Sequence, residues 1–157
     1  MELLIMNIVK RLRKSSLLSL RKKHYYRRNQ STKAYLSTIM FASLVGTYLD
    51  LLLVGAGRYS FPSRPFSEIF TINILFTLFI LPVFSFLIIL VLKRLHPISR
   101  YLLLFICSLF VYIAEQIAEQ FGLFIHSTYW KHEFSLFGYL LFFIVIWKFY
   151  SWQVSHK

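Results

Sequence analysis

Two glutamates and two glutamines alternate within an otherwise apolar stretch, and they are the residues best suited to chemistry. The segment from Ile113 to Gly122 reads IAEQIAEQFG and lies between YLLLFICSLFVY and LFI. A charged acid at the centre of a membrane helix costs about 2.5–3.5 kcal/mol on insertion scales, so such a residue usually has a role. Glu115 and Glu119 are four residues apart and would be neighbours on a helix. Their titrations would then be coupled, which favours protonation of one of them.

Other polar residues are predicted to join this pair. Asp50 would lie about 24 Å along its own apolar helix, and Glu115 about 21 Å along a later one, so both reach a similar depth. The tyrosines at positions 48, 59 and 112 can add hydrogen bonds if they face inward. The candidate polar or ion site comprises Asp50, Glu115, Glu119, Gln116, Gln120, Arg58, Arg64 and His126. Lys131 or His132 would be a further counter-charge.

A stripe of small residues runs beside the glutamates, one position out of phase. Ala114, Ala118 and Gly122 recur at the same spacing of four. Small residues allow another helix to approach closely. We therefore expect the acidic face to point into a helix bundle and away from lipid.

Two interpretations of the acidic residues follow. In the structural one, Asp50, Glu115 and Glu119 connect two helices to the outer loops through ion pairs and hydrogen bonds. In the functional one, the same carboxyls form a cavity site for a proton, a cation or a polar ligand, as intramembrane acids often do.

Metal and catalytic sites are not expected. His126, His132, Glu133 and Glu119 could converge, but HSTYWKHE matches no standard zinc spacing. The sequence contains no GxSxG elbow, Walker loop, CxxC pair or dinucleotide fingerprint. We therefore expect neither an enzyme nor a cofactor. The single cysteine, Cys107, excludes an intrachain disulfide.

Four long apolar stretches would position these residues. Hydrophobic residues make up 57% of the 157 residues and charged residues only 15%, which is typical of a multi-pass membrane protein. Because about 20 residues cross a hydrocarbon core of about 30 Å, we place helices near 34–54, 71–92, 101–125 and 134–152. The predicted fold is an all-α four-helix transmembrane bundle over residues 34–157. Pro82 is expected to kink the second helix.

Basic residues predict the orientation of this bundle. Of the 18 Lys and Arg, all but Arg58, Arg64 and Lys131 lie in the N-terminal region, the connection after the second helix, or the C-terminal part. Under the positive-inside rule, both termini are cytoplasmic and the protein lies in the cell membrane.

The first 33 residues form a separate basic segment. Its apolar residues recur at spacings near three and four, which predicts a basic amphipathic helix on anionic lipid headgroups. A solvated tail that only sets topology is the alternative, and nucleic acid is not expected because no recognition motif is present. The predicted lipid-surface contacts are Lys10, Arg11, Arg13, Lys14, Arg21, Lys22, Lys23, Arg27 and Arg28.

The stretch from Gly46 to Pro82, GTYLDLLLVGAGRYSFPSRPFSEIFTINILFTLFILP, resembles a family of small four-helix integral membrane proteins of endospore-forming Firmicutes. WKHEFSLFG, from Trp130 to Gly138, is compatible with the same family. The resemblance implies a location in the bacterial plasma membrane and supplies no catalytic residues.

The expected function is therefore that of an accessory or structural membrane component without catalytic activity. Its expected partners are the bilayer and either another membrane protein or a second copy of the chain. The alternative is proton or cation transport or sensing through Asp50, Glu115 and Glu119.

Overall fold

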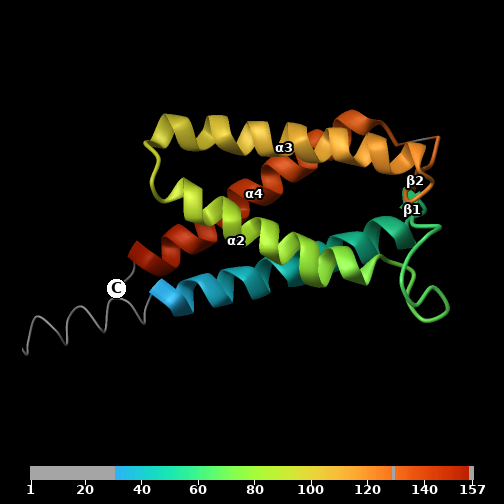
Figure 1. The fold of residues 1–157 in the computed structure, drawn as a ribbon, viewed down its shortest axis with the longest axis horizontal. Coiled ribbons are helices and arrows are strands. Elements are labelled where there is room, and N and C mark those ends of the chain that lie inside the picture. The colour runs from blue at the N-terminus through green and yellow to red at the C-terminus, as the bar shows by residue number, and fades with distance from the viewer. Residues whose placement is uncertain (1–30, 129, 156–157) are drawn as a thin grey trace, which may run out of the picture.

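The structure is a computed structural model that describes residues 31–128 and 130–155, and this part of the chain is mostly helical (Figure 1). The first helix spans Ser31–Gly55. It is followed by a π-helical turn, η1 (Phe76–Ile80), and by α2 (Leu81–Leu92), α3 (Pro97–Gln120) and α4 (His132–Ser155). The first helix, α3 and α4 are each long and apolar enough to cross a membrane, whereas η1 and α2 form a shorter apolar helix.

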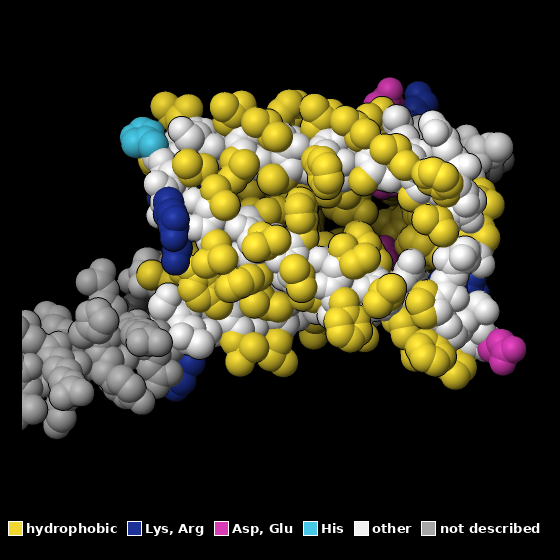
Figure 2. All heavy atoms as spheres, viewed as in Figure 1, with side chains coloured by type: hydrophobic (Ala, Val, Ile, Leu, Met, Phe, Trp, Pro, Cys, Tyr) yellow, Lys and Arg dark blue, Asp and Glu magenta, His cyan; other side chains and the backbone are white. Residues whose placement is uncertain are grey.

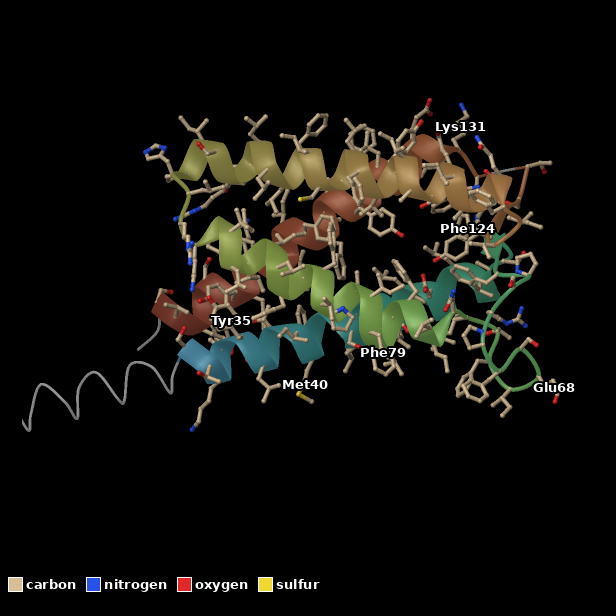
Figure 3. All side chains as sticks on the ribbon, viewed as in Figure 1. Tyr35, Met40, Glu68, Phe79, Phe124 and Lys131 are labelled. Carbon is tan, nitrogen blue, oxygen red and sulfur yellow. The ribbon has the colours of Figure 1, made fainter. Side chains whose placement is uncertain are left out.

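Charged and apolar side chains are separated on the surface. Figure 2 shows hydrophobic side chains over the flank of the helices and charged side chains at the two ends. Met40 and Phe79, which are 66% and 64% exposed, project away from the bundle (Figure 3). A helical chain with an apolar flank and charged ends fits a membrane-embedded protein.

The bundle has two distinct ends. Figure 1 shows the start of the first helix near the end of α4, on the side that we call the terminal end. The opposite side, the loop end, carries the short strands β1 (Tyr59–Ser60) and β2 (Ile125–His126) and the long loop before η1.

Between the helices, apolar side chains form one core. Phe143 of α4 is 1% exposed, and Leu104 of α3 and Ile89 of α2 are fully buried. At the terminal end, the Gln153 side chain of α4 hydrogen-bonds to Thr38 of the first helix, with Nε2 3.1 Å from Oγ1. α4 thus contacts each of the other helices.

A π-helical turn, η1, lies directly before Leu81 and Pro82, and Pro82 is the residue that was expected to kink the second helix. Proline lacks an N–H and its ring crowds the preceding turn, which frees carbonyl groups there. The Ser43 hydroxyl of the first helix donates to the Thr77 carbonyl at 3.0 Å, replacing one lost bond. The helix was expected from residue 71 but begins at Ile74, after Asn73, whose Oδ1 accepts the Phe76 N–H at 3.2 Å.

The prediction that the third helix continues to residue 125 is wrong, because α3 ends at Gln120. Gly122 has a φ of 69°, in the left-handed region that glycine adopts without strain. The N–H groups of Gly122 and Leu123 donate to the carbonyls of Glu119 and Ala118, each at 2.9 Å. This Schellman motif ends the helix and turns the chain back.

The first helix ends in the same way. Gly57 has a φ of 65°, and the N–H groups of Gly57 and Arg58 donate to the carbonyls of Val54 and Leu53, at 3.0 and 2.9 Å. Both helices therefore release the chain at the loop end by the same motif.

Two short strands follow these turns and pair with each other. β1 and β2 are antiparallel, with Tyr59 opposite His126 and Ser60 opposite Ile125. The Ser127 N–H extends the pairing to the Arg58 carbonyl at 2.9 Å. The all-α prediction missed this pair, which fastens the first helix to α3 at the loop end.

Other boundaries also differ from prediction, and α3 begins at Pro97 and not at residue 101. α4 extends two or three residues beyond the predicted 134–152 at each end, and residues 31–33, assigned to the N-terminal segment, belong to the first helix. The predicted amphipathic helix, with its nine basic lipid contacts from Lys10 to Arg28, lies outside the described residues.

Candidate functional site

The imidazole of His126 lies between the two carboxyl groups of α3. Its Nε2 is 2.7 Å from Oε1 of Glu115, and its Nδ1 is 3.0 Å from Oε1 of Glu119. The side chains of His126 and Glu115 are only 6% and 9% exposed, whereas that of Glu119 is 32% exposed. We call these three residues the acid–imidazole cluster.

Sequence and local structure explain this geometry. Glu115 and Glu119 are one helical turn apart, so their carboxyl groups project from the same face of α3. The Schellman motif at Gly122 reverses the chain, and pairing with β1 holds β2 in place. The His126 backbone N–H also lies 3.3 Å from Oε1 of Glu119, which holds the strand against the helix end.

If both ring contacts are hydrogen bonds, the cluster carries one proton more than a neutral imidazole with two carboxylates. A neutral imidazole has one donor and one acceptor nitrogen, whereas a carboxylate only accepts. Either His126 is protonated and donates to both glutamates, or one glutamic acid is protonated and donates to the ring. Both arrangements leave a single net negative charge on the cluster.

A chain of donors extends the cluster to α4. The Ser135 hydroxyl donates to Oε1 of Glu115 at 2.6 Å, and Nε1 of Trp130 donates to the Ser135 hydroxyl at 3.2 Å. Ser135 is buried. Sequential hydrogen bonds in a buried site polarise one another and strengthen the network. One set of bonds therefore connects α3, β2 and the first turn of α4.

Asp50 of the first helix is bound by Tyr59 of β1, the strand that pairs with β2. The Tyr59 hydroxyl donates to Oδ1 of Asp50 at 2.6 Å, a charge-assisted distance. Burial raises the pKa of the Tyr59 hydroxyl well above its usual range, and the negative charge of Asp50 adds to this effect. The phenol therefore stays a neutral donor. Oδ2 of Asp50 is buried and has no hydrogen-bond partner in the described part of the chain.

Aromatic rings pack against the cluster at the loop end. The edge of the Phe124 ring meets the His126 ring, with centroids 4.4 Å apart and planes at 88°. Phe124 is 7% exposed and also contacts Tyr59 and Phe61, with centroid distances of 4.9 and 5.2 Å. Figure 3 shows Phe124 at the loop end, between α3 and the first helix. Excluding water in this way strengthens each polar contact inside.

The two arginines of the candidate site lie elsewhere. The Arg64 guanidinium donates to three backbone carbonyls of its own loop and not to a carboxylate. Arg58 is exposed, and its carbonyl takes part in the strand pairing. Among the described residues, the predicted counter-charge that contacts both glutamates is His126. Lys131 is exposed on the outer surface (Figure 3).

The glutamines contribute less than predicted. Gln120 is exposed and Gln116 is half-buried, and neither hydrogen-bonds to another described residue. The small-residue stripe was also misread. Ala114 and Gly122 are exposed, and Gly122 serves the helix end through its positive φ and not through close helix packing. The acids nevertheless face inward.

The cluster is unsuited to a metal ion. The two carboxyl groups approach opposite nitrogens of one ring, so the three groups do not share a point where an ion could bind. Among the described residues, no group of three or more His, Cys, Asp or Glu is placed to hold a metal ion.

Ser135 and Trp130 were not predicted as site residues. Neither has a spacing that connects it to the glutamates, because the contact arises where α4 packs on α3. The aspartate–tyrosine pair had a partial signal, since Tyr59 was among three tyrosines expected to bond if they faced inward. Tyr48, another of these, is 61% exposed.

The flank of the bundle is hollowed near the cluster. Figure 2 shows an opening between α3 and the neighbouring helices, closer to the loop end, with acidic side chains visible inside it. The buried acids are therefore not sealed on every side.

No family model, curated protein or solved structure matches this chain.

Proposed function

We propose that this chain is a non-enzymatic multi-pass membrane protein, an accessory or structural component whose acid–imidazole cluster fastens the loop end of the bundle. The observation that carries this proposal is the His126 ring, which is hydrogen-bonded on both sides by carboxyl groups of α3. Because β2 carries the ring and pairs with β1, the same contacts connect the ends of the first helix and α3. Ser135 adds α4.

The proposal includes a membrane topology. In it, η1 and α2 cross the bilayer together with the three long helices, so both termini lie on one side. The clustering of Lys and Arg at the terminal end supports a cytoplasmic location for that end. The family resemblance supports a bacterial plasma membrane, and anionic headgroups are the proposed partner of the basic N-terminal segment.

A second candidate function is proton or cation sensing or transport through Asp50, Glu115 and Glu119. Two observations favour it: the carboxyl groups on both sides of the His126 ring, and the buried Oδ2 of Asp50, which has no hydrogen-bond partner among the described residues. Intramembrane acids often mark proton or ion pathways. In this reading, the opening in the flank would give access to the cluster (Figure 2).

One pair of variants distinguishes the two functions. Glu115→Gln/Glu119→Gln removes both carboxylates with almost no change in shape. Glu68→Gln/Glu133→Gln neutralises two exposed acids, both outside the cluster, and is the matched control. Proton and monovalent-cation flux would be measured in liposomes for the wild type and both variants, together with thermal unfolding.

The structural function predicts no flux in any of the three proteins. It also predicts that the free energy of unfolding falls by about 1–3 kcal/mol in the cluster variant, because His126 would be left with poorer hydrogen-bond partners. The control variant should lose almost no stability. Flux in the wild type that disappears in a cluster variant of normal stability would instead establish the transport function. If both variants had wild-type stability and no protein showed flux, neither function would stand.

A further inference from the structure

The loop between β1 and η1 exposes three apolar side chains although it lies outside the helices. Phe66, Ile69 and Phe70 are 67%, 73% and 42% exposed. The residues that hold the two sides of the loop are buried, with Phe61 9% and Ile72 2% exposed. The loop is therefore fixed to the bundle at its base and presents apolar groups at its tip.

The tip is held in an ordered conformation by one arginine. Arg64 donates from Nε to the Phe70 carbonyl at 2.6 Å, from Nη1 to the Phe61 carbonyl at 2.5 Å and from Nη2 to the Ser67 carbonyl at 3.1 Å. The Phe66 carbonyl accepts two backbone N–H groups, from Ile69 at 2.9 Å and from Phe70 at 3.0 Å. These bonds fix the backbone that carries the exposed side chains.

Phe66 also has an unfavourable backbone conformation. Its φ is 55°, in the left-handed region that bulky residues rarely adopt. Strain of this kind persists where the surrounding contacts impose it, and it often accompanies a functional surface. The loop thus presents Phe66 outward at an energetic cost.

The tip continues the apolar flank of the second apolar helix. This helix begins at Ile74 and ends at Leu92, while the three long helices have 23 to 25 residues. At 1.5 Å per residue it extends about 28 Å, close to a hydrocarbon core of about 30 Å, so the loop tip lies beside the end of the apolar span. Its exposed residues Leu75 and Phe79 lead towards the loop, so apolar groups at the tip extend the flank on this side.

We propose that Phe66, Ile69 and Phe70 insert into the bilayer interface on the loop side, beside the start of the second apolar helix. Contact with lipid would explain why the three exposed side chains are apolar and why they continue the apolar flank of the helices. Glu68 lies between them in sequence but is exposed and projects from the outer edge of the loop (Figure 3).

A quenching experiment tests this location. Cysteine would be placed by Phe66→Cys, Ile69→Cys or Glu68→Cys in a Cys107→Ser background and labelled with an environment-sensitive fluorophore. The full chain would be reconstituted at a low protein-to-lipid ratio in phosphatidylcholine–phosphatidylglycerol vesicles, with iodide on both sides of the membrane. Lipids carrying a nitroxide near the headgroup would be the second quencher, and thermal unfolding would confirm that each labelled protein is folded.

Labels at positions 66 and 69 should be quenched by iodide several-fold less than the label at position 68, and several-fold more by the nitroxide lipid. Equal iodide quenching at all three positions would overturn the proposal, because the tip would then lie in water. Protection of positions 66 and 69 from both quenchers would also overturn it, since another protein surface would cover them. The two positions are read independently, so one poorly folded variant does not leave the question open.

Discussion

A tight contact between the first helix and α2 yields a sharp prediction. Gly46 of the first helix is buried against Leu81, the first residue of α2. A Cβ at Gly46 would lie 2.2 Å from Cδ2 of Leu81, whereas carbon atoms pack at about 3.5–4.0 Å. Leu81 is itself 4% exposed and packed in the core, so its side chain has little room to move.

The magnitude of the effect follows from overpacking. An added methyl group in a packed core costs about 1–3 kcal/mol. Replacing a helical glycine by alanine also gives a backbone gain of about 0.5–1 kcal/mol. Gly138 of α4 provides the control, because a Cβ there would meet nothing within 4 Å. Both variants receive the backbone gain, so the difference between them measures the clash alone, about 1–3 kcal/mol.

Reversible unfolding in mixed micelles would measure Gly46→Ala against Gly138→Ala. Adding Leu81→Ala removes the clashing atoms, so Gly46→Ala should cost little in that background, giving a coupling energy of about 1–3 kcal/mol. Equal stability of Gly46→Ala and Gly138→Ala would refute the reasoning and show that the first helix and α2 do not pack so closely.

Two further predictions concern hydrogen bonds between elements. Tyr59→Phe should lower stability by about 1–3 kcal/mol, because the carboxyl of Asp50 loses its donor. Because the pKa of Tyr59 is raised in the folded state, its neutral hydroxyl contributes stability below pH 10.0, and this contribution is lost as the pH rises above that value. The free energy of unfolding, followed from pH 9 upward, should therefore decline less steeply in Tyr59→Phe than in the wild type. An identical decline in both proteins would contradict the assignment. Ser43→Ala should lower the free energy of unfolding by about 1 kcal/mol, because it removes the donor to the Thr77 carbonyl. The loss should be smaller in a Pro82→Ala background, where a backbone N–H is restored. Equal losses in both backgrounds would mean that the proline is not the reason for this bond.

The candidate site was partly predictable from local spacing. Glu115 and Glu119 had to share a helix face, because residues four apart are neighbours on any α-helix. His126 was among the proposed counter-charges, but its place between the two acids depends on a helix end that hydrophobicity does not reveal. An apolar run continues through Phe121 and Leu123, while the helix stops because Gly122 adopts a positive φ. Arg64 was misplaced because backbone carbonyls of its own loop accept hydrogen bonds from its guanidinium in place of a carboxylate.

Sequence alone determined the apolar helices and their approximate bounds. These properties depend on hydrophobicity and helix rise, which are local and additive along the chain. Only the tertiary structure decided which groups meet. The pairing of Tyr59 with His126, the donor from Ser135 and the contact between Gly46 and Leu81 join residues far apart in sequence. Such contacts depend on where helices end and how they pack, and neither property is encoded within a single segment.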